Sequence, residues 1–154
     1  MKIELLADNS EFLPTLVDWY EREWGLYYGV DGPGNAQADL ASRCNKGIIP
    51  VGFVAKENDQ LLGVAALDLD SVTSLTPSVV GLMVAHEFRR RGVASRLLKS
   101  AALLAEELGH DQVYISSTVL GDHLLRNGWR RIGDLQFLND EQGSIYVFDL
   151  PAFK

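Results

Sequence analysis

The sequence predicts a fold of the α+β class. The spacing of apolar residues changes several times between the period of a strand and that of a helix, without an intervening linker. Two of the strand-like runs flank a short polar stretch, which is typical of a hairpin. A chain of 154 residues is long enough to bury one core. We therefore expect a single domain over residues 1–154.

The first third of the chain predicts one strand and two helices. An apolar run at residues 2–6 is short and strand-like. From Ser10, a candidate N-cap, apolar residues recur at helical spacing and predict a helix that Gly25 ends. The loop 29–35 is rich in glycine and proline, and the segment 36–46 after it predicts a second, shorter helix.

The remainder predicts a hairpin, a long helix and a second group of strands. Two strand-like runs lie on either side of the polar stretch 57–60, and a third apolar run follows at residues 78–85. Apolar residues then recur at spacings of three and four from Gly92 to residue 108, which predicts a long amphipathic helix. The later elements are a strand at 112–118, a short helix up to Gly128, and strands near 129–137 and 144–150.

Composition excludes some classes of function. A net charge of -7 and an isoelectric point near 4.9 argue against general nucleic-acid binding. We expect no membrane partner, because no apolar stretch is long enough to span a bilayer. The N-terminus lacks a secretory signal and Cys44 is the single cysteine, so a cytoplasmic protein is expected. Cys44 is interpreted as a small packing residue in preference to a nucleophile.

Three consecutive arginines stand at the predicted junction between the strand 78–85 and the long helix. Peptide N–H groups at the start of a helix have no partner within it, so the N–H groups of residues 89–95 can bind an anion. Gly92 and Ala94 leave the backbone uncovered there. The arginines would add charge-assisted hydrogen bonds. The pattern therefore predicts a phosphate or pyrophosphate site.

Three motifs carry a resemblance to a known family. The run Arg89-Arg90-Arg91-Gly92-Val93-Ala94 fits the signature Gln/Arg-x-x-Gly-x-Gly/Ala. Leu82-Met83-Val84 stands in the place of a Leu-x-Val strand, and Asn127-Gly128-Trp129 in the place of Leu-Gly-Phe. With the matching order of elements from residue 2 to 150, the chain resembles the GNAT superfamily of acetyl-CoA-dependent N-acetyltransferases.

The resemblance implies a mixed, mostly antiparallel central sheet with helices on both faces. The sheet would split between the strands 78–85 and 112–118, and coenzyme A would lie in the split. The implied cofactor-binding residues are Leu82, Met83 and Val84 at a bulge, with the Val84 N–H on the thioester carbonyl, and Arg89, Arg90, Arg91, Gly92, Val93, Ala94 and Ser95 around the pyrophosphate. Leu82 and Val84 are also core side chains in any fold. A solvated face or a nucleic-acid patch is the alternative for the arginines.

The resemblance also implies an activity. The protein would move the acetyl group of acetyl-CoA to a primary amine, on a small molecule or a peptide N-terminus, by direct attack in a ternary complex. Two usual groups are missing: the family's tyrosine position is Leu124, and residues 77–81 supply no glutamate. This absence motivates the rival hypothesis of a non-catalytic acetyl-CoA-binding regulator that docks on a partner protein.

Other residues could replace the missing acid and base. His123 adjoins the tyrosine position and histidine titrates near neutral pH, although an ordinary surface histidine is the alternative. Ser117 and Thr118 end a strand at the mouth of the implied cleft, or serve as caps. Asp68 and Asp70 alternate with leucines, which predicts one shared face of a strand. They would accept an ammonium proton if that face lines the cleft, and otherwise are solubilising residues.

The acceptor would be recognised by the first two helices and their loop. Glu23, Trp24 and Tyr28 lie there, and aromatic rings beside a carboxylate suit an amine on a partly apolar body. Trp24 packed on the sheet is the alternative.

Two further expectations concern metals and subunits. No metal is expected, because His86 lacks a second histidine four residues further on. A homodimer could form through edge strands near 129–150.

Overall fold

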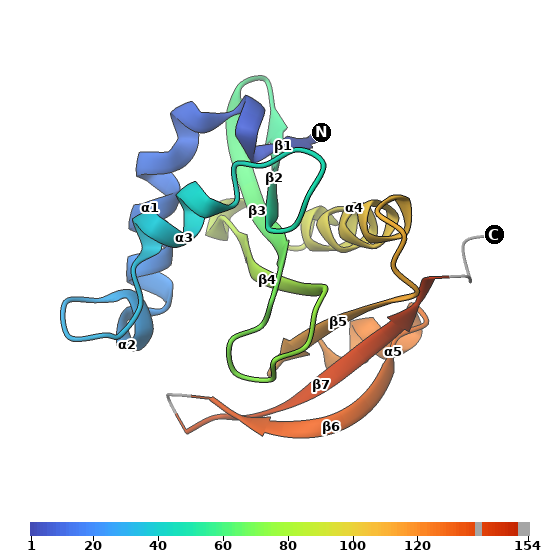
Figure 1. The fold of residues 1–154 in the computed structure, drawn as a ribbon. Helices are drawn as coiled ribbons and strands as arrows, with labels where there is room; N and C mark the ends of the chain where they lie inside the picture. Colours follow the sequence, from blue (N-terminus) through green and yellow to red (C-terminus); the bar gives the residue numbers. More distant parts are fainter. Residues whose placement is uncertain (138–139, 151–154) are drawn as a thin grey trace.

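A seven-stranded sheet forms the centre of the computed structural model, which describes residues 1–137 and 140–150. The strand order is β1-β2-β3-β4-β5-β7-β6, and every neighbouring pair is antiparallel except β4 and β5. The predicted mixed, mostly antiparallel sheet is confirmed (Figure 1). The strands are β1 (Lys2–Leu5), β2 (Val51–Glu57), β3 (Gln60–Asp68), β4 (Ser78–Val84), β5 (Gln112–Ser117), β6 (Arg130–Gln136) and β7 (Gln142–Asp149).

Helices cover both faces of the sheet, as predicted. Figure 1 shows α1 and α3 on one side of the central strands and α4 on the other. The described helices are α1 (Leu13–Glu23), α2 (Gly25–Tyr28), α3 (Ala36–Ser42), α4 (Val93–Glu107) and α5 (Gly121–Arg126), with 3-10 turns at Leu6–Asp8, Ser10–Phe12 and His86–Phe88.

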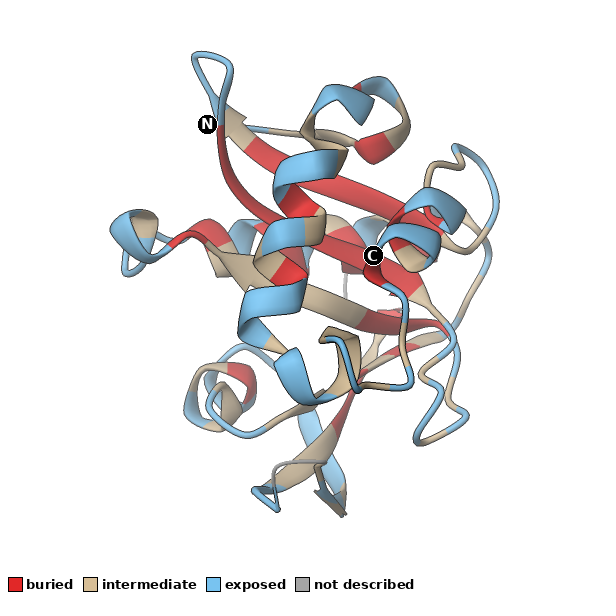
Figure 2. Cartoon of the chain, turned by 90° about the vertical axis from the view of Figure 1, so that its left-hand side faces the viewer, coloured by how far each residue is buried: buried red, intermediate tan, exposed pale blue. Residues whose placement is uncertain are grey.

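The sheet separates two hydrophobic cores. Along β2, Phe53 and Ala55 join the core beneath α4, while Val54 between them joins the core beneath α1 and α3. Because both faces are covered, β2 and β3 are nearly continuous runs of buried residues (Figure 2). This burial makes the central strands a rigid support for the residues at the end of β4.

The predicted hairpin is confirmed at β2 and β3. Asn58 and Asp59 form its turn, and both have positive φ angles, of 52° and 65°. A two-residue turn of this kind matches the twist of the strands, and asparagine and aspartate tolerate it well.

Two element boundaries differ from the prediction. Ser10 is not the N-cap of the first helix, because α1 begins at Leu13 and Ser10 opens a 3-10 turn without a side-chain cap. Pro14 lies in the first turn of α1, where its fixed φ favours helix initiation. The second helix ends at Ser42 instead of residue 46. The Asn45 side chain donates to the Ser42 carbonyl at 2.9 Å and replaces the next helical bond.

β1 and β6 form the two edges of the sheet. Pairing of β6 between subunits stays a prediction. In residues 1–137 and 140–150, no helix has the length and apolar character needed to cross a bilayer.

Candidate active site

The sheet splits between β4 and β5. The two strands pair at only two positions, where the first residues of β4 meet the middle of β5: Ser78 lies beside Tyr114 and Val79 beside Ile115. Beyond these pairs they diverge, and β5 continues with β7 and β6 in a separate direction (Figure 1). The backbone of β4 after Val79 therefore lacks a strand partner on this side, and the predicted split is confirmed.

A bulge interrupts β4 beside the split. Gly81 and Leu82 lie opposite the single residue Ala65 of β3, and Gly81 has a φ of +61°. The Tyr20 hydroxyl donates to the Gly81 carbonyl at 2.7 Å. A Cβ at position 81 would collide with that hydroxyl, so glycine is required both by the backbone angle and by the space.

Val84 presents its backbone to the split. The Ala85 N–H donates to the Leu62 carbonyl at 2.9 Å, and alternate residues of an antiparallel strand face opposite neighbours. The N–H and carbonyl of Val84 therefore point away from β3. Accordingly, the Arg89 side chain reaches the Val84 carbonyl, with an Nε–O distance of 3.2 Å.

The start of α4 carries a group of free backbone donors. Gly92 is the N-cap, with a φ of +79°, and the Arg96 N–H makes the first helical bond, to the Gly92 carbonyl at 3.1 Å. The N–H groups of residues 90–95 have no hydrogen-bond partner in the part of the chain that the structure describes. A Cβ on Gly92 would have no atom within 4 Å. The corner is therefore open and suited to an anion.

The three arginines directly precede Gly92 at this corner. All three are exposed. Arg89 contacts the Val84 carbonyl, and the Arg91 guanidinium lies 5.6 Å from the centre of the Phe88 ring. Arg90 adopts a left-handed φ of +65°. The peptide N–H groups, held by the fold, are thus the fixed part of the predicted anion site.

His123 lies at the same corner. Its Nε2 is 3.0 Å from the Ser95 Oγ, in the first turn of α4. The contact joins α5 to α4 and brings one residue considered for catalysis to one considered for cofactor binding.

Ser117 has a local structural role. Its Oγ accepts hydrogen bonds from the N–H groups of Val119 and Leu120, at 3.2 and 3.0 Å. It therefore caps the turn that leads into α5, which is the second of the two interpretations considered for it.

The predicted shared face of Asp68 and Asp70 is wrong. β3 ends at Asp68, and Asp70 lies in the following turn, where its carboxylate accepts from the Val72 N–H at 2.9 Å. Asp68 accepts from the Arg43 Nε at 3.2 Å and from the Leu69 N–H at 2.7 Å. Both carboxylates thus hold the chain where it leaves the strand.

Leu124 occupies a core position. Its side chain is fully buried in the cluster beneath α4. The position at which many family members carry a tyrosine is therefore occupied in this chain by a buried leucine of the core. His123 is the neighbouring polar residue.

Aromatic rings from α1 and α2 form a cluster beside α3. Tyr20 contacts Trp24 edge-on at 5.0 Å and stacks with Tyr28 at 5.7 Å, and the Tyr28 hydroxyl donates to Asp39 at 2.7 Å. Burial raises the pKa of Tyr20 to about 12. Burial, and then the bond to Asp39, raises the pKa of Tyr28. Glu23 is exposed at the end of α1.

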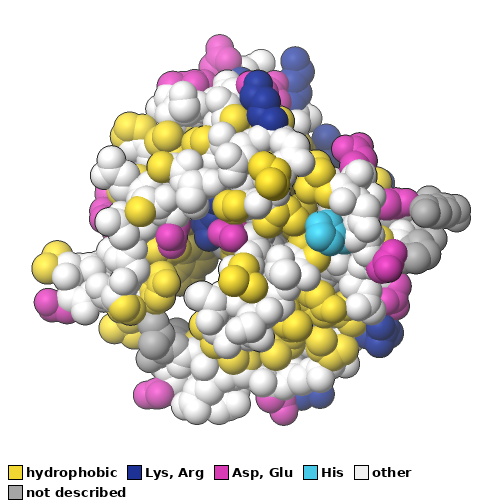
Figure 3. All heavy atoms as spheres, viewed as in Figure 1, with side chains coloured by type: hydrophobic (Ala, Val, Ile, Leu, Met, Phe, Trp, Pro, Cys, Tyr) yellow, Lys and Arg dark blue, Asp and Glu magenta, His cyan; other side chains and the backbone are white. Residues whose placement is uncertain are grey.

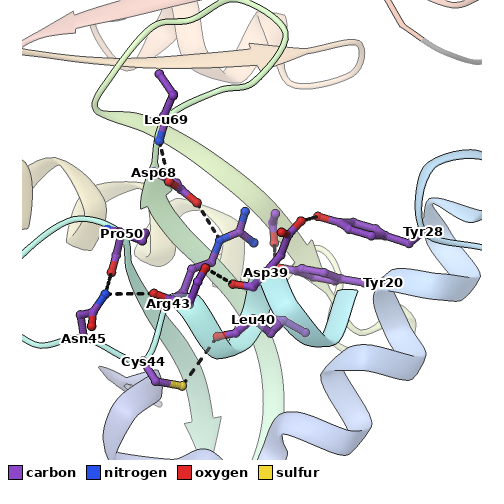
Figure 4. A network of polar contacts seen from close by, with 12 residues as sticks. Tyr20, Tyr28, Asp39, Leu40, Arg43, Cys44, Asn45, Pro50, Asp68 and Leu69 are labelled. Atoms are coloured by element: carbon purple, nitrogen blue, oxygen red, sulfur yellow. Dashed lines mark hydrogen bonds and ion pairs between the residues drawn. The ribbon is translucent and has the colours of Figure 1, made fainter. Parts of the chain in front are cut away.

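Sequence reasoning missed Arg43. It follows α3, its side chain is only 8% exposed, and it pairs with Asp68 (Figure 4). Nothing in the local pattern indicates burial, because a single arginine after a short helix is usually solvated. Its partner lies 25 residues away, so only the tertiary fold shows the pair.

Cys44, the next residue, packs against the core beneath α1 and α3. Burial raises the pKa of its thiol, which lowers the fraction of reactive thiolate. This agrees with a packing role.

The described surface also holds a hollow of about 460 Å³. Asp68, His110 and the loop 47–50 line it, whereas none of residues 82–84 or 89–95 does. It is therefore not part of the split described above.

The family to which the chain belongs follows from a match to a family model. The acetyltransferase (GNAT) family model matches residues 13–129, which is most of the chain. The chain belongs to the GNAT acetyltransferase family. It is accordingly an acyltransferase that uses acetyl-CoA, as the resemblance implied. A comparison with curated proteins finds none that matches.

Solved structures show the same fold. An aminoglycoside 6'-N-acetyltransferase complexed with coenzyme A superposes with a TM-score of 0.76 at 13% identity, covering 97% of both chains. The aminoglycoside 6'-N-acetyltransferase from Enterococcus faecium gives 0.74 at 14% identity, again over 97% of both. N-acetylglutamate synthase from Neisseria gonorrhoeae, complexed with coenzyme A and N-acetyl-glutamate, gives 0.65 at 16% identity over 97% of this GNAT chain and 35% of its own.

The described residues fit the coenzyme. The open corner at Gly92 offers six free peptide donors, which suits a pyrophosphate, and the split beside β4 offers the Val84 N–H to a carbonyl.

Proposed function

We propose that this GNAT protein transfers the acetyl group of acetyl-CoA to a primary amine, on a small molecule or a peptide N-terminus, within a ternary complex. The observation that carries the proposal is the open corner at the start of α4, next to a split in the sheet that exposes the Val84 N–H. Two structural neighbours are aminoglycoside N-acetyltransferases, which supports an amine acceptor.

The chain's own groups would bind and orient the reactants. When bound, acetyl-CoA supplies an acetyl thioester. The N–H groups of residues 90–95 would hold its pyrophosphate, with charge added by Arg89, Arg90 and Arg91. The N–H of Val84 would donate to the thioester oxygen, where negative charge develops as the amine nitrogen attacks. Leu82 and Met83 would flank the acetyl group through the β4 backbone, since their side chains pack into the cores on opposite faces of the sheet.

His123 is the proposed proton carrier. The acceptor amine must lose a proton, and the departing sulfur gains one. His123 is the titratable residue that contacts the first turn of α4, through Ser95. We assign no proton transfer to Asp68 or Ser117, because each already holds a turn through its hydrogen bonds.

Acceptor recognition is proposed at the aromatic cluster. Glu23, Trp24 and Tyr28 lie on or beside α1 and α2, and Asp39 adds a carboxylate beside the Tyr28 hydroxyl. Rings beside carboxylates attract a cationic amine.

The rival function is an acetyl-CoA-binding regulator. The burial of Leu124 at the usual tyrosine position favours it, because no phenol can serve as the acid there.

Release of free thiol from acetyl-CoA in the presence of a panel of amines separates the two functions. We expect thiol release that depends on the amine and saturates with it. Tight acetyl-CoA binding without thiol release from any amine would instead establish the regulator.

A further inference from the structure

The Arg43 guanidinium is a buried cation with an unused donor. The residue is 6% exposed, and its Nε donates to Asp68 at 3.2 Å. Its Nη1 is enclosed by protein and has no hydrogen-bond partner among the described residues. A buried charged donor without a partner loses the stabilisation that water would give it. Such a group is unusual in a folded protein and favours a function in binding.

The neighbouring carboxylates do not satisfy it. Asp68 contacts only the Nε of Arg43. Asp39 lies on α3, four residues before Arg43, a spacing at which an ion pair commonly forms. Its carboxylate instead accepts a hydrogen bond from the Tyr28 hydroxyl at 2.7 Å. Figure 4 shows the guanidinium between Asp68 and the Asp39–Tyr28 pair. The Tyr20 hydroxyl also lies beside the guanidinium, and it donates its own proton to the Gly81 carbonyl. Burial raises the pKa of both Tyr20 and Tyr28, so neither hydroxyl adds negative charge at neutral pH.

The guanidinium lies beside the bulge of β4. Nη1 is 3.2 Å from the position that a Cβ on Gly81 would occupy. Gly81 directly precedes Leu82–Val84, the segment that faces the split. In the space-filling view, acidic and basic side chains meet near the centre of the face, at the rim of a hollow (Figure 3). The Nη1 side of the Arg43 guanidinium therefore lies against the β4 backbone, next to the segment that leads to the proposed site of acetyl transfer.

From this placement we infer that the acceptor amine also carries a carboxylate, and that Arg43 binds it. The inference rests on the proposed transferase function and names its substrate class. Arginine matches a carboxylate in charge and in the planar geometry of its donors. A polycationic amine without an anionic group would instead bring like charge to the buried guanidinium.

The spacing limits the length of the acceptor. A strand advances about 3.3 Å per residue, and the bulge at Gly81 and Leu82 shortens that advance, so Val84 lies within about 10 Å of Gly81 along β4. The amine that attacks beside Val84 and the carboxylate that binds beside Gly81 must both fit within this distance. A short acceptor, such as an α- or β-amino acid, meets that limit.

Matched acceptors test the inference. Thiol release from acetyl-CoA is measured with L-amino acids and β-alanine, each against its own amide, which keeps the amine and removes the carboxylate charge. We expect kcat/KM for the acids to exceed that for the amides about ten- to one-hundred-fold, the value of one charge-assisted hydrogen bond. Equal rates for acids and amides, or faster amides, would overturn the inference.

Variants connect the preference to Arg43. Arg43→Gln should reduce the ratio of acid to amide to about one, whereas Arg22→Gln, at an exposed arginine of α1 that pairs with Asp18, should leave it unchanged. Arg43→Lys keeps the charge and should retain part of the preference. Arg43→Gln/Asp68→Asn removes both members of the ion pair and tests the same ratio if the single variant is unstable. A preference that survives both Gln variants would overturn the assignment to Arg43.

Binding distinguishes failure of this inference from failure of the proposed function. If no amine releases thiol, the transferase proposal falls, and calorimetry with coenzyme A present then compares the affinity of each acid with that of its amide. Tighter binding of the acid that Arg43→Gln abolishes would uphold the carboxylate site. Equal affinity, or binding of neither, would reject it.

Discussion

Gly92 combines two separable properties, a left-handed backbone and an open surface. Its φ of +79° is costly for any residue with a Cβ, by about 1 to 2 kcal/mol. However, no atom lies within 4 Å of the position of that Cβ, so a side chain there meets no steric barrier. Backbone strain and blocking of the anion site can therefore be measured apart.

We predict that Gly92→Ala lowers the free energy of unfolding by about 1 to 2 kcal/mol and largely preserves coenzyme A affinity. Gly92→Glu should carry a similar stability loss and abolish binding, because its carboxylate would stand beside the pyrophosphate. Urea unfolding and calorimetric titration measure the two effects. Equal coenzyme A affinity of the two variants would show that the pyrophosphate does not bind at this corner.

Gly81 differs from Gly92 because its surroundings are closed. Gly81→Ala should lower the free energy of unfolding by about 2 kcal/mol or more, since the Cβ collides with the Tyr20 hydroxyl at a backbone angle that is itself strained. Gly47→Ala, where no atom lies within 4 Å, is the control and should have little effect. Adding Tyr20→Phe to Gly81→Ala should restore part of the loss. If the double variant is no more stable than Gly81→Ala, the collision is not the cause.

At the scale of elements, α5 is attached to the start of α4 through His123 and Ser95. This contact could act only by holding the two helices together, or the imidazole could also carry a proton. The two roles predict different effects on the rate of acetyl transfer when His123 or Ser95 is substituted.

We predict that His123→Ala lowers kcat at least tenfold and removes one limb of the pH–rate profile, because general acid catalysis contributes about a hundredfold or more. Ser95→Ala breaks the same contact between the helices and should keep the shape of the profile. Steady-state thiol release from pH 5.5 to 9 measures both. An unaltered profile for His123→Ala would exclude it as the proton carrier.

Across the whole molecule, ionic hydrogen bonds hold both ends of the sheet. At one end, Arg130 and then Gln112 hold the pKa of Asp149 below its usual value, and they connect β6, β7 and β5. At the other end, Asn9 and then Lys56 lower the pKa of Glu4, between β1 and β2. Both carboxylates are partly exposed, so each contribution is screened by solvent.

These shifts predict acid sensitivity. A carboxyl group with a lowered pKa in the folded state stabilises the protein above its unfolded pKa of about 4. That stabilisation is lost as the pH falls through this value toward the folded pKa. Between pH 7 and pH 3.5, Asp149→Asn and Glu4→Gln should therefore lose less stability in urea unfolding than the unmodified protein. Asp122→Asn, at an exposed carboxylate with no ion pair among the described residues, should lose as much. Identical losses in all four proteins would contradict the assignment.

Local patterns in the sequence were sufficient for most of the architecture. Apolar patterns predicted the strands and the long helix, because a helix with one buried face repeats apolar residues at spacings of three and four, whereas a buried strand is a short apolar run. The three positions at Gly92–Ala94 predicted an anion site because unpaired N–H groups at a helix start are a backbone property that requires no distant partner. The polar groups around the reaction could not be found in this way. Asp68 and Asp70 alternate with leucines like strand residues, but the strand ends between them.

The sequence by itself determined the family, the order of the main elements and the open corner at the start of α4, since each depends on residues close together in the chain. Only the tertiary structure decided which side chains meet at the split. Tyr20 reaches Gly81 across 61 residues, and Arg43 reaches Asp68 across 25. Such pairs depend on how α1 and α3 pack on the sheet. The Arg43 side chain is buried, and its Nη1 left without a partner, only when these helices pack against the sheet.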